Sequence, residues 1–429
     1  MDKLALFGGK PVINQELKLY RSAGAEELKA VAEVMESGTL SGFIGAWCKE
    51  FNGGPMIRQF EEKWAERFNV KHAVTVNSNT SGLIAAMGAV GVGPGDEVIV
   101  PPWSMSATAM APIFYGGIPV FADVEDQYFC LDPESVLQNI TSRTKAIIVV
   151  NLFGHPGQLA ELRALADKHG IALIEDNAQA PLAAENGQLA GTVGHIGVFS
   201  LNYHKHIHTG EGGVCTTNDD DLALRLQMIR NHGENIVDAV GMEDITNIVG
   251  FNFRMTEMSA AVGLCQLDKV ETLVNRRVAL AEKLSEAVRE MPGINPPLVR
   301  EGCTHVYYQW CARFNEQVVG ISLKTFARAL EAEGCPVGTG YVDPLYLLPI
   351  FQRRIAIGNK GYPFNLTERQ YGPGLCPVTE RLNQCELLEF HICSFELDGE
   401  DMDKVIQAFQ KVYANRNILK EFEKGEATS

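Results

Sequence analysis

Short runs of apolar and β-branched residues alternate with amphipathic stretches between about residues 70 and 215. Within the amphipathic stretches, apolar residues recur three and four positions apart, which predicts helices. The runs predict seven strands, over 73–77, 97–101, 118–124, 145–153, 171–176, 197–201 and 212–217. Strands that alternate with helices at this spacing predict an α/β fold with a mostly parallel, seven-stranded sheet covered on both faces. Such sheets bind ligands beyond the carboxyl ends of their strands.

The pattern changes near residue 260, where a long amphipathic stretch over 259–291 predicts a helix with its charges on one side. Shorter mixed elements follow, and we expect a strand over 306–314, a helix that ends at Gly334 and a terminal helix over 401–418. The polar tail, 420–429, is expected to fray.

These patterns divide the chain into three expected parts. An N-terminal segment, 1–30, is expected to pack with the smaller domain. The large α/β domain is expected to cover 31–260, and a connecting helix with a smaller C-terminal α+β domain is expected to cover 261–429.

Composition and charge narrow the possible functions. The 429 residues are 46% apolar and 21% charged, the usual mix of a folded protein with a sizeable core. Lys and Arg number 37 against 53 Asp and Glu, so the net charge of −16 argues against nucleic acid or an anionic membrane as partner. The sequence has no apolar run of membrane-spanning length and no signal-peptide pattern. Its 10 cysteines form no C-x-x-C pair, which predicts reduced thiols in a cytoplasmic protein.

Two loops that follow predicted strands carry polar residues suited to a phosphorylated aromatic cofactor. In the first, Thr80 and Ser81 stand at the start of a helix, where hydroxyls and backbone N–H groups can hold a phosphate. An ordinary capped helix start is the alternative. In the second, Asp176 and Gln179 follow an apolar strand, and Asp176 could either bind a ligand or cap the next helix.

Two further loops add a nucleophile and a turn. Lys205 lies between two apolar strands and a Gly-rich turn, within the range 199–213. Shelter from water lowers the pKa of a lysine toward the neutral amine that forms Schiff bases. A solvated surface lysine is the alternative, and the apolar strands on both sides disfavour it. The fourth loop, 250–255, would by itself pass for a loop with a packing role.

Seven motifs occur together and in a fixed order along the chain: LALFGGKPV, GVGPGDEVIVPPW, IEDNAQA, FSLNYHKHIHTGEGG, GFNFRMTEMSAAVG, VYYQW and CPVTER. With them the chain resembles the DegT/StrS group of sugar aminotransferases, which depend on pyridoxal 5′-phosphate (PLP) and have the fold-type I architecture. The resemblance runs nearly from end to end. It implies a large PLP-binding domain, a smaller C-terminal domain and transfer of amino groups to keto sugars or ketocyclitols.

The resemblance also assigns roles to single residues. Lys205 takes the place of the lysine that binds PLP as a Schiff base and moves the proton at the substrate carbon. Asp176 matches the acid that keeps the pyridine nitrogen protonated, so that the ring can accept electrons. Gln179 matches the residue beside the 3-hydroxyl group of the cofactor.

The phosphate group of the cofactor has its own matching positions, which are Thr80, Ser81, Ser200 and Asn252. In the family, the residue at the place of Asn252 reaches the phosphate from the neighbouring subunit. The resemblance therefore implies a homodimer with shared active sites.

Three departures from the family pattern stand out. Met105 stands where the family usually has an aromatic ring stacked on the pyridine. Three alternatives follow: the thioether of Met105 takes the place of that ring, Trp103 moves into it, or Met105 only packs in the core. Asn151 stands where histidine is common, which could change a substrate contact. Extra residues near 42–54 lie in a segment that borders the substrate entrance in the family, so specificity could differ.

Three histidines, His204, His206 and His208, surround Lys205 at alternating positions. Such a pattern could bind a metal ion, but no acid or cysteine with ligand spacing joins it. We therefore expect no metal, and we expect one or more of the histidines to line the cofactor or substrate pocket. The aromatic residues at 306–310 have strand spacing, and core packing is their expected role.

The function predicted from the sequence is that of a PLP-dependent aminotransferase. It would move an amino group from glutamate or glutamine to a keto group of a sugar, nucleotide-linked in the expected case, or of a cyclitol. A PLP-dependent sugar 3-dehydratase is one alternative, although histidine replaces the lysine in such relatives and Lys205 is present here. A non-catalytic PLP-binding relative is the other, and the presence of Lys205 and Asp176 disfavours it.

Overall fold

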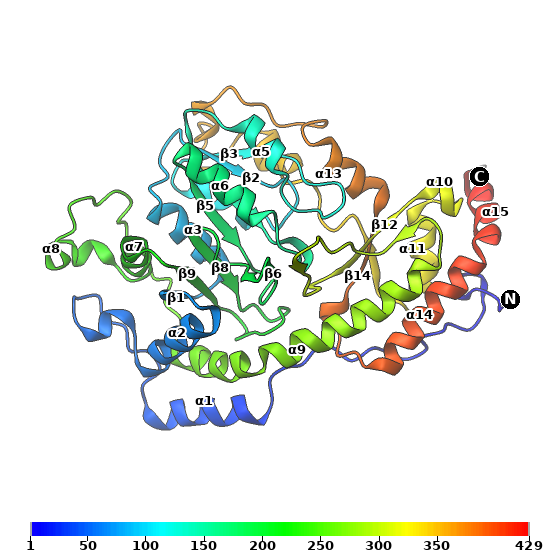
Figure 1. Ribbon diagram of the computed structural model, residues 1–429, viewed down its shortest axis with the longest axis horizontal. Helices are drawn as coiled ribbons and strands as arrows, with labels where there is room; N and C mark the ends of the chain where they lie inside the picture. The colour runs from blue at the N-terminus through cyan, green and yellow to red at the C-terminus, as the bar shows by residue number, and fades with distance from the viewer. Residues whose placement is uncertain (1, 428–429) are drawn as a thin grey trace.

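A seven-stranded sheet forms the centre of the larger part of the molecule, in a computed structural model that describes residues 2–427 (Figure 1). The strands, in spatial order, are β1 (His72–Val76), β9 (Gly213–Thr217), β8 (Ile196–Ser200), β5 (Ala172–Asp176), β4 (Thr144–Val150), β2 (Glu97–Val100) and β3 (Ile118–Phe121). All neighbouring pairs are parallel except the two that β9 makes. The predicted sheet is therefore confirmed, and each predicted run supplies one strand.

Helices cover both faces of this sheet, because alternate side chains of each strand point to opposite sides. On β4, Ile147 packs in the cluster of one face and Ile148 in the cluster of the other. The first face is covered by α2 (Pro55–Phe68), α5 (Pro133–Asn139), α6 (Leu159–His169) and the first half of α9 (Glu257–Arg289). The second face is covered by α3 (Asn79–Ala89), α4 (Ala107–Phe114) and α7 (Asp220–Arg230).

A second, antiparallel sheet forms the centre of the smaller part, in the order β10 (Ile294–Asn295), β12 (Trp310–Phe314), β14 (Leu387–Phe390) and β13 (Val337–Thr339). Its core cluster includes residues of α11 (Leu323–Ala332), α14 (Gly399–Ala414) and the second half of α9. The expected helix over 259–291 is α9, which runs beneath both sheets and links them (Figure 1).

The N-terminal residues pack on the smaller part. Leu4 and Ile13 belong to its core cluster, and the buried carboxylate of Glu333 accepts hydrogen bonds from the backbone of Ala5 at 2.8 Å and of Val12 at 3.1 Å. The next element, α1 (Ala25–Ser37), lies along α9. Both chain ends lie at the same end of the molecule (Figure 1).

Two expected elements differ in the smaller part. The expected strand over 306–314 forms a ladder only at β12, because Val306 donates its N–H to Gly154 O and Tyr307 has a positive φ of 49°. The polar tail is helical instead of frayed: after Asn415 the chain forms α15 (Arg416–Ala427), and residues 428–429 lie outside the described part. Leu419 anchors α15, because it is fully buried in the core of the smaller part.

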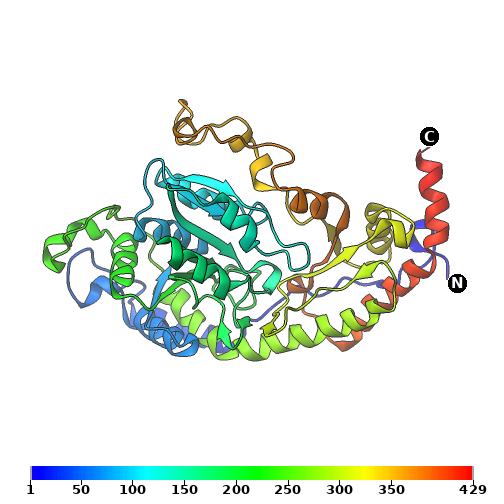
Figure 2. The same cartoon turned by 45° about the horizontal axis from the view of Figure 1, so that its top comes forward.

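A long excursion over 345–376 packs on the large sheet, although it falls inside the range expected for the small domain. Tyr346, Phe351 and Tyr371 contact Phe121 of β3 in the cluster of the second face. Figure 2 shows this segment, in gold and brown, reaching over the outer strands.

Among the described residues, no helix is long and apolar enough to cross a bilayer.

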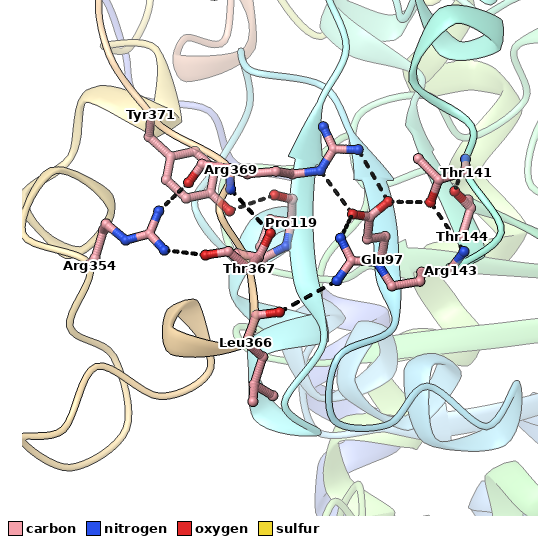
Figure 3. A network of polar contacts seen from close by, with 10 residues as sticks. All are labelled: Glu97, Pro119, Thr141, Arg143, Thr144, Arg354, Leu366, Thr367, Arg369 and Tyr371. Atoms are coloured by element: carbon pink, nitrogen blue, oxygen red, sulfur yellow. Dashed lines mark hydrogen bonds and ion pairs between the residues drawn. The ribbon is translucent and has the colours of Figure 1, made fainter.

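A buried carboxylate ties this excursion to the sheet (Figure 3). Glu97 at the start of β2 accepts hydrogen bonds from Arg369 Nε at 2.9 Å, Arg143 Nη2 at 2.6 Å and Thr141 Oγ1 at 2.6 Å. Burial opposes ionisation of Glu97, but the hydrogen bonds from Arg369 and Thr141 and the two guanidinium charges hold its pKa below the ordinary value. The Tyr371 hydroxyl adds a bond of 2.9 Å to Pro119 O.

We predict that Glu97→Gln lowers the free energy of unfolding by about 2 kcal/mol at neutral pH, since it removes the charge that both arginines share. The lowered pKa means that the ionised form stabilises the fold above pH 4.5, the ordinary value, and that this contribution is lost as the pH falls further. Denaturant unfolding across pH measures it, with the variant and the natural protein converging in acid. Equal stability at neutral pH would contradict the role given to Glu97.

Candidate active site

The carboxyl ends of β1, β5 and β8 meet at one edge of the large sheet, and Lys205 lies in the loop between β8 and β9. Its side chain is buried, and Nζ lies 4.3 Å from the ring centre of Tyr308. Burial lowers the pKa of Lys205 to about 8, against the opposing influence of Cys393 and Asp176. The structure therefore holds an amine whose neutral form is accessible near neutral pH.

The loop that carries Lys205 is held from two sides. Its backbone N–H bonds to Asn202 O at 2.9 Å inside the loop. The next residue, His206, is fully buried, with Nε2 2.8 Å from Val306 O, and Tyr20 donates its hydroxyl to His206 O at 2.6 Å. These contacts place the lysine between the two parts of the molecule.

Asp176 ends β5 and points into the same space. Its Oδ2 accepts from Thr108 Oγ1 at 3.2 Å, and its Oδ1 accepts from Ala178 N at 3.2 Å and Asn79 Nδ2 at 3.3 Å. Burial raises the pKa of Asp176, while these donors and the charge of Lys205 act in the opposite direction. A cation placed against the carboxylate would stabilise its ionised form further.

The start of α3 lies beside these two residues. Gly213 pairs with both Val76 and Ser200, so β9 begins between the ends of β1 and β8. A Cβ atom on Gly213 would lie 2.8 Å from the carbonyl carbon of Ser78, which leaves room only for glycine. The helix start is therefore packed tightly against the strand ends, and its free N–H groups are available to an anion.

The expected phosphate ligands differ in how free they are. Thr80 is exposed at this helix start, and Ser200 Oγ accepts from Asn202 N at 3.3 Å. Ser81 is buried, and its hydroxyl already bonds to Asn77 Oδ1 at 2.5 Å. Asn252 is exposed, with Oδ1 accepting from Arg254 Nε at 2.8 Å, and the next residue, Phe253, accepts a backbone bond of 2.8 Å from Asn77 N.

Gln179 lies in the loop after β5 and is buried. Its Oε1 accepts from Phe153 N at 2.7 Å, and its Nε2 donates to the Tyr341 hydroxyl at 2.9 Å. The oxygen and the nitrogen of the Gln179 amide are thus both hydrogen-bonded, and Tyr341 is the partner from the smaller part.

Two of the three expectations for Met105 are wrong. Met105 is 64% exposed, so it does not fill the core, and it lines a hollow of about 460 Å³ together with Tyr341 and Asp343. Trp103 does not swing in, because its Nε1 donates to Gly340 O at 3.1 Å and Val342 O at 2.9 Å in the core. The thioether of Met105 remains the group available at that position.

The other departures have structural roles in this chain. Asn151 is fully buried, and its side chain bonds to Asn177 Oδ1 at 2.8 Å and to Gly157 N at 2.9 Å. It therefore links the loops that follow β4 and β5. The extra segment near 42–54 is held by Asn231, whose Nδ2 donates to the carbonyl oxygens of Ile44 and Phe51. Its expected place at the substrate entrance stays a prediction.

The histidines around Lys205 have different partners. His206 bonds to a backbone carbonyl, whereas the ring of His204 lies against Tyr203 and Tyr308. Burial and the charge of Lys205 lower the pKa of His204 to about 4. Within residues 2–427, no group of three His, Cys, Asp or Glu side chains is arranged to hold a metal ion.

Sequence reasoning missed several residues of this site. Thr108 and Asn79 bond to Asp176, and Tyr308 flanks Lys205, although core packing was the expected role of Tyr308. Thr108 lies inside a helix without a recognisable motif, so no sequence signal pointed to it. The VYYQW motif could have indicated Tyr308, but its spacing does not reveal the neighbour of the ring.

The groups at this edge fit PLP. PLP carries an aldehyde, a ring nitrogen and a phosphate. Lys205 provides an amine for the aldehyde, Asp176 provides a carboxylate for the ring nitrogen, and the start of α3 provides N–H groups for the phosphate. The sequence profile of the DegT/DnrJ/EryC1/StrS aminotransferase family matches residues 22–410. This chain belongs to that family. It is a PLP-dependent aminotransferase of fold-type I.

Individual relatives and solved structures resemble the chain along most of its length. The L-glutamine:2-deoxy-scyllo-inosose aminotransferase of Micromonospora echinospora is 34% identical in an alignment of 434 positions, which covers 98% of this chain and 100% of that protein. The spore coat polysaccharide biosynthesis protein SpsC of Bacillus subtilis (strain 168) is 32% identical over 400 residues, covering 91% and 95%. The aminotransferase from Psychrobacter cryohalolentis has a TM-score of 0.80 at 29% identity, covering 94% and 100%. S. venezuelae DesV has a TM-score of 0.76 at 30% identity, covering 90% and 94%.

Proposed function

We propose that this aminotransferase moves the amino group of L-glutamine to a keto group of a cyclitol or sugar. The observation that carries the proposal is the pair formed by buried Lys205 and Asp176 at one sheet edge. The choice of glutamine and of a cyclitol follows the relatives, because several are L-glutamine:2-deoxy-scyllo-inosose aminotransferases at 32% to 34% identity.

PLP supplies a carbonyl that condenses with amines and a ring that accepts an electron pair. Lys205 would hold PLP through its amine, because burial favours the neutral form of that amine. The same Lys205 amine would carry the proton at the substrate carbon. The face of Tyr308, 4.3 Å from Nζ, restricts where that amine can move.

Asp176 is proposed to hold a proton on the ring nitrogen of the cofactor. Thr108 and Asn79 bond to its two oxygens and orient the carboxylate. Thr80, Ser200 and the N–H groups at the start of α3 are proposed to bind the phosphate. Gln179 is proposed to lie beside the 3-hydroxyl group.

A nucleotide-linked keto sugar is the second candidate acceptor. A solved structure of DesI in the presence of its TDP-sugar product has a TM-score of 0.81 to this chain at 28% identity, covering 99% of both. The hollow of about 460 Å³ beside Met105 is open and could admit either kind of acceptor. The dehydratase and non-catalytic alternatives are disfavoured, because Lys205 and Asp176 are both present and share one space.

Three further assignments belong to the proposal. We place the enzyme in the cytoplasm, in keeping with ten free cysteines among the described residues. We propose that the small domain combines the N-terminal segment with most of 261–429, as the shared core cluster indicates. The excursion over 345–376 is assigned to the large domain, on whose sheet it packs.

The donor reaction tests the proposal directly. L-glutamine added to the PLP-loaded enzyme should bleach the visible absorbance of the bound cofactor, and a ketone acceptor should restore it. Lys205→Ala should slow this by about 10³-fold or more, because both the attacking amine and the proton carrier are lost. Lys145→Ala, which removes an exposed lysine of the same sheet, is the matched control and should react normally.

Normal bleaching by Lys205→Ala would contradict the role of Lys205. Failure of the natural enzyme to react with any amino donor would favour the non-catalytic alternative.

We also propose a homodimer with shared sites. Asn252 is exposed, and its side chain bonds to Arg254 of the same loop, which leaves the amide accessible to a partner chain. Mixed and reassembled Lys205→Ala and Asn252→Ala chains should recover about one quarter of normal activity, since half of the dimers are mixed and one of their two sites is intact. Each variant alone should remain inactive. No recovery, or a fully active monomer in sedimentation, would contradict shared sites.

A further inference from the structure

Glu389 is a carboxylate that the smaller part of the molecule buries. It lies on β14 and is 4% exposed. Gly338 on the neighbouring strand makes room for it, because a Cβ atom there would lie 2.8 Å from Glu389 Oε1. Among the described residues, the basic side chain within ion-pair distance is His391, with Nε2 at 3.9 Å. A carboxylate with so little charge compensation calls for an explanation.

Its hydrogen-bond donor is the backbone of Tyr341, whose N–H lies 3.1 Å from Glu389 Oε1. Tyr341 has a φ of 60°, a left-handed conformation that side chains with a Cβ atom rarely adopt. The Tyr341 ring packs edge-on against Phe153 at 5.0 Å. Glu389 thus holds the backbone of Tyr341 in a conformation that it would not prefer by itself.

The other end of Tyr341 reaches the active site. Its hydroxyl accepts from Gln179 Nε2 at 2.9 Å, and Gln179 Oε1 accepts from Phe153 N at 2.7 Å. Gln179 stands three residues after Asp176 in the loop that follows β5. Tyr341 therefore links a buried acid of the small sheet to the loop of the cofactor site, with one hydrogen bond at its backbone and another at its hydroxyl.

We propose that Glu389 is a positioning residue of this aminotransferase: through Tyr341 it holds Gln179 in place at the cofactor site, and its charge strengthens that hold. The proposal rests on the PLP-dependent function, but it concerns a residue of the small sheet, outside the loops that carry Lys205 and Asp176. It assigns a use to a buried acid in the part of the molecule that does not carry Lys205.

The charge of Glu389 changes near neutral pH, because burial raises its pKa to about 7. The groups that face it are the Tyr341 backbone, His391 beside it and Cys311 on β12. Burial lowers the pKa of His391 and raises that of Cys311, so both shifts favour the neutral forms of these two groups. An ionised carboxylate accepts a stronger hydrogen bond than a neutral one. The hold on Gln179 therefore strengthens as the pH rises through 7.

Cofactor binding to the apoenzyme tests the link. Glu389→Gln keeps an acceptor for the Tyr341 N–H but removes the charge. At pH 6 we expect the variant and the natural protein to have the same affinity for PLP. At pH 8.5 we expect the variant to bind PLP about fivefold more weakly, an effect of the size that coupling between contacting residues typically has. In a Tyr341→Phe background, Glu389→Gln should have no further effect, since the chain is already broken. Titration of apoenzyme with PLP, followed by fluorescence, measures each dissociation constant.

Glu386→Gln is the matched control. Glu386 lies three residues before Glu389 but pairs with Arg313 and Arg381 at 2.8 Å, outside the chain of hydrogen bonds. It should leave the pH dependence of PLP binding unchanged. A Glu389→Gln effect equal at both pH values, or equal with and without the Tyr341 hydroxyl, would overturn the proposal.

Thermal unfolding of the apoenzyme separates titration from positioning. A pKa raised in the folded state means that ionisation costs stability, so the natural protein should lose stability relative to Glu389→Gln as the pH rises from 4.5 through 7. If this occurs without the change in PLP binding, Glu389 titrates but does not position the site, and the proposal is wrong. If PLP binding follows the predicted pattern while no amino donor reacts, the proposed substrates fail and the role of Glu389 stands.

Discussion

Burial of an amine and a carboxylate at the same edge of one sheet is the constraint on which the site depends. Lys205 and Asp176 are both withdrawn from water, and burial shifts each toward its neutral form. A neutral amine is the reactive form of lysine, whereas a cationic partner favours the ionised form of Asp176. The pair is therefore suited to a cofactor that brings both an electrophile and a protonated ring nitrogen.

The fold supplies this shelter through connections between distant segments. β9 runs antiparallel to its two neighbours, so its first residue, Gly213, stands at the edge where β1 and β8 end. That arrangement brings the start of α3 to Asp176, through Asn79. The smaller part, joined by α9, contributes the Tyr308 ring above Lys205 and the Tyr341 hydroxyl beside Gln179. The site is thus built between the two sheets, although its reactive residues come from one.

The sheet and its reactive residues could be predicted from the sequence because they leave local signals. Apolar runs mark the strands; Asp176 ends one such run, and Lys205 lies between two of them. Thr108 and Tyr341 leave none, since their roles arise from contacts with residues far along the chain. The tail was misjudged for a related reason: its polar composition hides Leu419, which becomes buried only when the core of the smaller part assembles.

The pH dependence of acylation at Lys205 in the apoenzyme tests most directly whether burial produces the reactive amine. Labelling with acetic anhydride, read out by mass spectrometry of the Lys205 peptide, reports the neutral fraction of this one side chain. The account predicts half-maximal reactivity near pH 8, and a lower midpoint in Asp176→Asn, because the charge of Asp176 raises the pKa of Lys205. A midpoint near 10.5, the ordinary value for lysine, would contradict it.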